Sequence, residues 1–158
     1  MNIKKKSLVS VVCLLVIFST ITSSALVYTT DFYSNRSWTY TYDAPATPVY
    51  NCLAYALGNT STTIWPWNGY NPTDAQVTAY LNSLGYVKWT GQGTRPNIIS
   101  YGTTSEVVHF SRVTGTGCTA KWGQLERFTH GSGNPYNTGW DMWSWNNLYY
   151  GNAVTYYY

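Results

Sequence analysis

The hydrophobic period of this chain changes once, near residue 86, and that change limits the fold more than any other feature. Before it, Val77, Tyr80 and Leu81 recur at helical spacing. After it, β-branched and aromatic residues form short runs typical of strands, most clearly over 106–113. A chain that places its helices first and its strands afterwards is predicted to have an α+β fold.

Two helices are expected before the change of period. The first follows Asn51, a favourable N-cap residue, and ends before Gly58. The second begins with a capping box, in which Thr73 is the N-cap and Gln76 stands at N3, and it ends at Gly85. The strand-like segments, which we expect to form an antiparallel meander, are 86–89, 97–101, 106–113 and 118–122.

The first 25 residues have the layout of a secretory signal peptide. Three lysines at 4–6 precede an apolar run over 8–18, and Ser23, Ser24 and Ala25 provide small residues for cleavage. This run is shorter than the ~20 residues that a membrane-spanning helix needs, so cleavage is favoured over an uncleaved anchor. We therefore expect a secreted protein with a signal peptide (1–25), an extended lead-in (26–50) and one α+β domain with an aromatic-rich C-terminal segment (51–158).

Charge and composition exclude several classes of protein. The formal net charge of +3 comes entirely from the leader lysines, because residues 26–158 contain six cationic and six anionic side chains. A nucleic acid partner is therefore not expected. An aromatic fraction of 18% argues against a disordered polar chain, and a charged fraction of 9% argues against a coiled coil.

Cys52 and His109 are the candidate catalytic pair. Cys52 would open the first helix, whose N-terminal partial positive charge stabilises a thiolate. An imidazole held in mid-strand could act as base and then as acid. The helix carrying Cys52 is expected to pack on the strand face shared by Val107, His109, Ser111 and Val113. The alternatives are a cysteine that only fills the core and a histidine that is only hydrogen-bonded.

Neither a metal site nor a disulfide scaffold is expected. The cysteines and histidines outside the leader have no short ligand spacing, so no metal ligands are assigned. Cleavage would remove Cys13 and leave Cys52 and Cys118, which are 66 residues apart. One disulfide between them remains an alternative, and it would prevent Cys52 from acting as a nucleophile.

An ordered set of short motifs resembles the papain-like secreted hydrolases of the NlpC and CHAP type. Residues 51–58 read Asn-Cys-Leu-Ala-Tyr-Ala-Leu-Gly, which is similar to the nucleophile helix of those proteins. The whole set is most similar to a little-characterised bacterial family with papain-like features. The further motifs are, in order, Trp65-Pro66, Leu84-Gly85-Tyr86, the segment 97–101, Val108-His109, Lys121-Trp122-Gly123 and His130.

This resemblance implies a papain-like α+β fold in which the nucleophile helix packs on an antiparallel sheet. It also implies a cysteine hydrolase that cleaves amide bonds of peptides or cell-wall peptide, with Cys52 attacking and His109 as base and then acid. His130 is favoured as the third catalytic residue, and Asn51 and Gln124 are candidates for oxyanion or orienting roles. No cofactor is implied, no membrane contact is expected after cleavage, and a monomer is the working expectation.

Two other functions stay open at this stage. Exposed tryptophan and tyrosine side chains can stack on sugar rings, so the same fold could be a non-catalytic module that binds cell-wall glycan. Trp140, Trp143 and Trp145 are candidates for such contacts, although the preferred interpretation is that they only seal the sheet. The remaining alternative is a secreted structural or toxin-like protein held by a bridge between Cys52 and Cys118.

Overall fold

The computed structural model describes residues 40–93, 95–115, 117–131, 133–134 and 150–158. The expected signal peptide lies outside these ranges, as does most of the lead-in before residue 40. The three tryptophans proposed for glycan contact, Trp140, Trp143 and Trp145, also lie outside the described residues.

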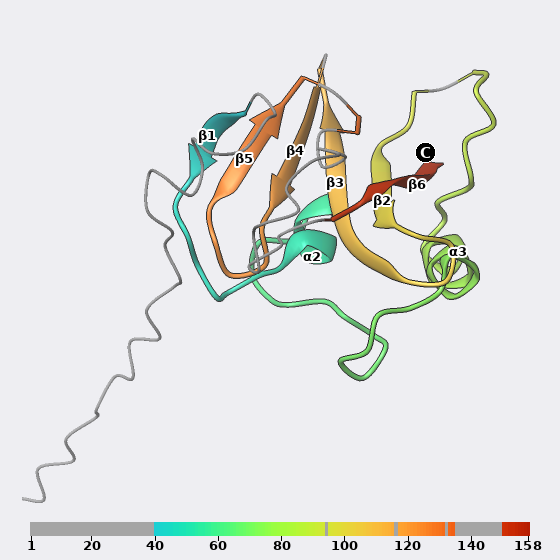
Figure 1. Ribbon diagram of the computed structural model, residues 1–158, viewed down its shortest axis with the longest axis horizontal. Helices are drawn as coiled ribbons and strands as arrows, with labels where there is room; N and C mark the ends of the chain where they lie inside the picture. Colours follow the sequence, from blue (N-terminus) through green and yellow to red (C-terminus); the bar gives the residue numbers. More distant parts are fainter. Residues whose placement is uncertain (1–39, 94, 116, 132, 135–149) are drawn as a thin grey trace, which may run out of the picture.

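Within the described residues, the centre of the structure is an antiparallel sheet of six strands in the order β1-β5-β4-β3-β2-β6 (Figure 1). Strands β2, β3 and β4 correspond to three of the expected strands, and the antiparallel meander is confirmed. The strands are β1 (Thr41–Ala44), β2 (Ile98–Gly102), β3 (Val107–Thr114), β4 (Gly117–Lys121), β5 (Arg127–His130) and β6 (Asn152–Tyr157).

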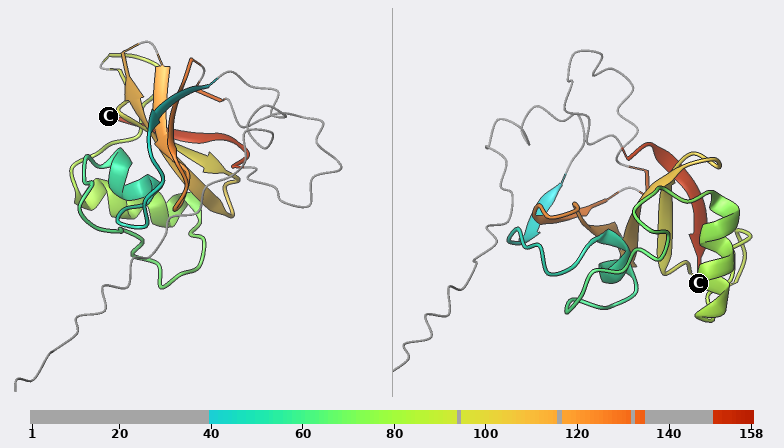
Figure 2. Two further views of the ribbon diagram at one scale, coloured as in Figure 1. Left: turned by 90° about the vertical axis from the view of Figure 1, so that its left-hand side faces the viewer. Right: turned by 90° about the horizontal axis from the view of Figure 1, so that it is seen from below.

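Helices α2 (Cys52–Ala56) and α3 (Asp74–Ser83) lie on the same side of this sheet (Figure 2). Both are confirmed where the sequence placed them. Asn51 caps α2 by accepting from the Ala54 N–H, and Thr73 and Gln76 form the complete capping box of α3. The expected α+β architecture, with a helix packed on an antiparallel sheet, is therefore present.

The two edges of the sheet differ from the expectation. Strand β1 lies inside the expected lead-in and pairs with β5, so this part of the lead-in is regular structure. The segment 86–89 is not a strand. It runs beside β6, with an isolated bridge between Lys88 and Tyr157 and a hydrogen bond from the Trp89 N–H to the Tyr156 carbonyl.

Strand register assigns each side chain to one of two faces. Partners across an antiparallel pair point to the same side, and Ser100 pairs with Phe110 while Tyr101 pairs with His109. Phe110 packs with Cys52 in the core beneath the helices, which we call the helix-side core. Tyr101 belongs to a second buried cluster on the opposite face, which we call the far-side core, together with Ile99, Cys118, Ala120, Trp122, Leu125 and Phe128.

An irregularity at the start of β3 explains why the side chains of Val107 and His109 lie on opposite faces of the sheet. The register shifts between Tyr101 and Gly102, and Val107 packs in the helix-side core. Gly102 has φ +131°, and a side chain there would collide with the carbonyl oxygen of Glu106. Val107 therefore lies on the opposite face from His109, Ser111 and Val113, which corrects the expectation that all four share one.

Candidate functional site

Cys52 is sealed beneath the sheet. It begins α2 as expected, but only 5% of its surface is exposed and it packs in the helix-side core with Leu53 and Phe110. Burial raises the pKa of its thiol to about 11, an effect that a hydrogen bond with the Phe110 backbone opposes only in part. The thiol is therefore neutral at physiological pH.

His109 projects from the other face of the same strand. Its side chain is fully buried, and its ring stacks on Tyr150 with centroids 3.7 Å apart. Burial, with a further contribution from His130, holds the pKa of His109 well below its usual range. The expected packing of α2 on the face of His109 is wrong, because α2 contacts the face of Phe110, and the structure does not bring Cys52 and His109 together.

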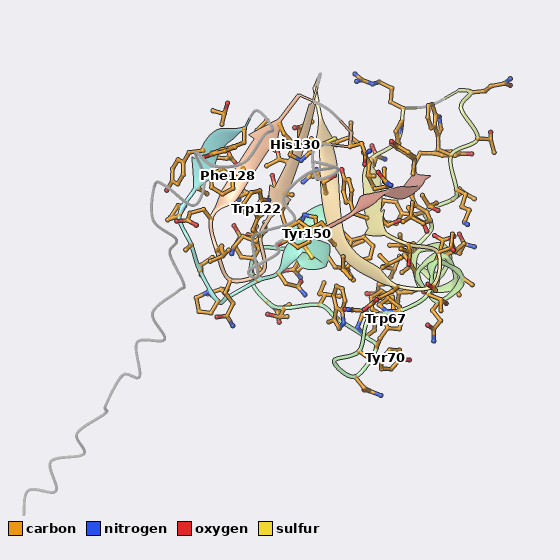
Figure 3. The ribbon with its side chains drawn as sticks, viewed as in Figure 1. Trp67, Tyr70, Trp122, Phe128, His130 and Tyr150 are labelled. Atoms are coloured by element: carbon orange, nitrogen blue, oxygen red, sulfur yellow. The ribbon has the colours of Figure 1, made fainter. Side chains whose placement is uncertain are left out.

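His130 lies on the same face as His109. Register places it opposite Cys118, which in turn is opposite Val113. Figure 3 shows His130 and Phe128 along β5, with Trp122 and Tyr150 nearby. The two histidines therefore share one face of the sheet, and the thiol on that face belongs to Cys118 rather than to Cys52.

Asn51 and Gln124 do not have the positions expected of oxyanion or orienting groups. The Asn51 Oδ1 accepts from the N–H groups of Ala54 (3.0 Å) and Ile64 (3.3 Å), and its Nδ2 donates to the Ile64 carbonyl (2.8 Å). The amide therefore holds the start of α2 against the following loop. Gln124 is exposed in the turn between β4 and β5.

The alternative of a disulfide-bridged protein is contradicted. Cys52 and Cys118 are both free thiols, and they belong to cores on opposite faces of the sheet. Two sulfur atoms can be joined only where the two Cα atoms approach within about 7 Å and the Cβ vectors converge. The backbone of the sheet separates these two side chains.

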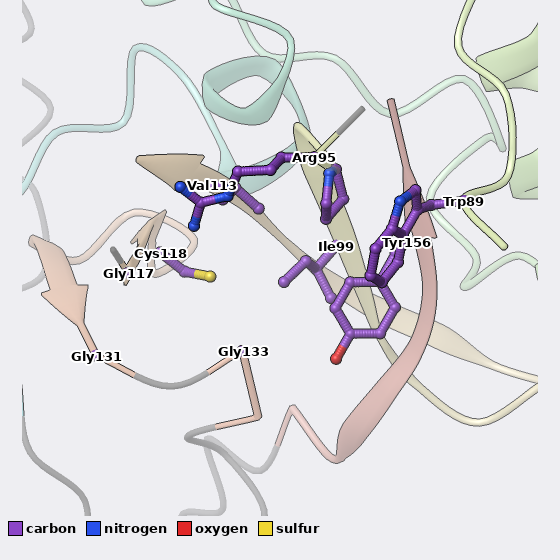
Figure 4. A pocket seen from close by; sticks show the side chains of 10 residues that line it. Trp89, Arg95, Ile99, Val113, Gly117, Cys118, Gly131, Gly133 and Tyr156 are labelled. Carbon is purple, nitrogen blue, oxygen red and sulfur yellow. The ribbon is translucent and has the colours of Figure 1, made fainter. Parts of the chain in front are cut away.

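A cavity of about 330 Å³ opens at the end of the sheet, on the face of Cys118 (Figure 4). Its size falls in the range of about 300–1,000 Å³ that is usual for small-molecule sites. Figure 4 shows the Cys118 sulfur pointing into it toward Ile99. The lining residues are Trp89, Arg95, Pro96, Ile99, Val113, Gly117, Cys118, Gly131, Gly133 and Tyr156.

The polar groups of this cavity are few and distinct. Arg95 is its single charged lining residue, and within the described part of the chain its guanidinium forms no ion pair. The Trp89 Nε1 is buried and has no hydrogen-bond partner among the described residues. The rings of Trp89 and Tyr156 lie 5.9 Å apart, which makes an aromatic wall.

The Cys118 thiol is held by hydrogen-bonding neighbours. Burial raises its pKa, while hydrogen bonds with Ser111 and Tyr101 and the charge of Arg95 oppose that rise. The Tyr101 hydroxyl and the Ser111 Oγ are themselves 2.8 Å apart. The thiol therefore stays protonated at neutral pH, which suits a lining group better than a nucleophile.

Sequence reasoning missed this cavity because its main residues come from distant segments. Trp89, Arg95, Cys118 and Tyr156 share no short motif, and only the sheet brings them together. Among the residues that the structure describes, no group of three histidine, cysteine or acidic side chains is arranged to hold a metal ion. None of the helices in those ranges has the length and apolar character needed to cross a bilayer.

Comparison with known proteins identifies the family. The chain belongs to the family described as "Domain of unknown function (DUF7689)", whose model matches residues 41–158. That match begins with β1, so the family domain includes the strand within the expected lead-in. No curated protein matches the chain. No solved structure matches it either.

Proposed function

We propose that this chain is an exported, non-catalytic module that binds a ligand in the cavity lined by Trp89, Arg95 and Tyr156. The observation that carries the proposal is the separation of Cys52 from His109 by the backbone of β3. A cysteine nucleophile needs its base within hydrogen-bond reach of its sulfur. A cavity with an aromatic wall and a few polar groups is, by contrast, what a binding site for a small molecule requires.

Cell-wall glycan is the ligand class that we favour. Sugar rings present apolar faces that pack on aromatic side chains, and Trp89 and Tyr156 supply two such side chains. The signal peptide expected at 1–25 would deliver the protein to that material. A balance of cationic and anionic side chains outside the leader argues against nucleic acid as a competing partner.

The papain-like resemblance remains a prediction. A short helix on an antiparallel sheet is compatible with it, and the motifs that carry it include Asn51-Cys52 and His109. A hydrolase on this fold would need the thiol and the imidazole on one face. The proposed module would therefore use the scaffold without Cys52 and His109 acting as a pair.

The proposal is tested by measuring binding and hydrolysis on the same protein. We expect purified peptidoglycan and its soluble fragments to bind, and no fragment to be cleaved. Trp89→Ala should weaken binding, because it removes half of the aromatic wall. Tyr70→Ala is the matched control, because Tyr70 is an exposed aromatic residue outside the cavity. Cleavage that Cys52→Ala abolishes would overturn the proposal, as would binding that Trp89→Ala leaves unchanged.

A further inference from the structure

We infer that the cavity selects ligands in which a carboxylate is attached to a ring, and that Arg95 is the residue that determines this preference. The inference rests on the proposed binding function and specifies its ligand. It follows from two features of the cavity, as the described residues form it: its largely apolar and aromatic lining and its single cation.

Among the described residues, the charge of Arg95 has no counterpart in the cavity. The other lining side chains are neutral at physiological pH, and the acidic groups that form ion pairs in the described residues, Asp43 and Asp74, are bound to Arg127 and Lys88. Arg95 is itself exposed, so a carboxylate would pair with it within reach of water while the attached ring packs on the apolar walls. The planar fork of N–H donors of the guanidinium also matches the two oxygens of a carboxylate.

Trp89 and Tyr156 supply aromatic surface for the ring of the ligand. Their ring centroids lie 5.9 Å apart and both side chains line the cavity. The Trp89 Nε1 is buried away from accessible space, so the contribution of Trp89 is its ring face. The ligand should therefore carry a ring that packs on these two side chains.

The volume limits the ligand to about one ring with its substituents. A cavity of about 330 Å³ lies at the lower end of the range for small-molecule sites. The acidic amino sugar N-acetylmuramic acid combines one ring, several oxygen acceptors and one carboxylate. N-acetylglucosamine has the same ring but lacks the whole lactyl ether that carries the carboxylate, so a second pair that differs less is needed beside these two sugars.

Calorimetric titration of the full chain with the two sugars, and with benzoate and benzamide as the second pair, tests the inference. We expect the acid of each pair to bind roughly tenfold more tightly than its neutral partner, the usual effect of a charged hydrogen bond. Arg95→Gln should remove that difference and leave the neutral ligand unaffected. Arg112→Gln is the control, because Arg112 is also exposed but lies on the helix face of the sheet.

Each outcome is decisive. Equal affinities within each pair, or an equal loss of affinity in the Arg95→Gln and Arg112→Gln variants, would overturn the inference while binding itself stands. No binding of either sugar or either benzoyl compound, together with no binding of peptidoglycan fragments, would overturn the proposed function as well. Rising salt should weaken the binding of the acids and leave the binding of the neutral ligands constant.

Discussion

Cys52 and His109 approach strand β3 from opposite sides: the thiol lies against the backbone of Phe110, and the imidazole projects from the adjacent residue into the other core. One peptide unit of β3 therefore separates two groups that a hydrolase would need in contact. This relationship makes the chemistry of the Cys52 thiol independent of His109.

The two thiols should differ in reactivity. Cys118 lines the cavity and should be alkylated by iodoacetamide before Cys52, whose thiol has a pKa of about 11. Both should react slowly, because only 3% of Cys118 and 5% of Cys52 is exposed and burial raises the pKa of both thiols. His109→Ala should leave the alkylation of Cys52 unchanged. Peptide mapping by mass spectrometry at neutral pH measures both rates. Fast labelling of Cys52 that slows in His109→Ala would restore the catalytic pair.

Asp74 should make the free energy of unfolding depend on pH in acidic solution. It is partly buried, which alone would raise its pKa, but hydrogen bonds from Lys88 Nζ (2.7 Å) and Thr155 Oγ1 (2.7 Å) lower the pKa overall. A carboxylate with a depressed pKa stabilises the fold above its unfolded value of about 4, and this stabilisation is lost as pH falls through the folded pKa. Asp74→Asn should lower the free energy of unfolding by about 1–3 kcal/mol at pH 7.

The control for Asp74 is Glu106→Gln, because Glu106 is exposed and accepts one hydrogen bond from Asn71. Urea denaturation at neutral pH and near pH 3 should show a smaller acid-induced loss of stability in Asp74→Asn than in the unmodified protein. An equal acid-induced loss of stability in Asp74→Asn and in the unmodified protein would mean that other carboxyl groups determine the acid response.

Lys121 should produce a second rise of stability with pH, in alkaline solution. Burial lowers the pKa of its amine to about 8, and Glu126 only partly opposes this. Between pH 8 and the unfolded value of about 10.4 the unfolded chain binds the additional proton, so the contribution of Lys121 to stability rises with pH. The free energy of unfolding of the unmodified protein should therefore rise more between pH 7.5 and pH 10 than that of Lys121→Met. Denaturation of both proteins at these two pH values measures this difference. Parallel curves would contradict the prediction.

Asn51 should matter for stability rather than for chemistry. Its side chain caps α2 and also holds Ile64, so Asn51→Ala should lower the free energy of unfolding by about 2 kcal/mol. Asn51→Ser keeps an N-cap oxygen but cannot reach Ile64 in the same way, and about half of the loss should remain. Thermal and chemical unfolding measure the two variants. Equal stability of Asn51→Ala and the unmodified protein would contradict the assigned role.

Local signals predicted the helices well because capping is local. The capping box of Thr73 and Gln76 and the N-cap at Asn51 involve residues three positions apart, so the sequence contains the whole interaction. The same holds for the strand around His109, whose β-branched and aromatic residues favour extended backbone. These elements were predicted without knowledge of their neighbours.

The face of β3 could not be predicted in this way. Phe110 and Ser111 are both fully buried although they point to opposite sides, so the strand lacks the alternation that marks a core face. The shift at Gly102 then moves Val107 to the other side. The cavity was missed for a related reason, because Trp89 and Tyr156 meet only after β6 has joined the sheet.

The sheet acts as a partition between two interiors that are packed separately. Side chains that anchor the helices fill one compartment, and the other contains Ile99 and Cys118, which also line the cavity. Substitutions in the two compartments should therefore act additively. The residues that line the cavity could therefore be substituted to accept a different ligand while the helix-side core continues to stabilise the fold.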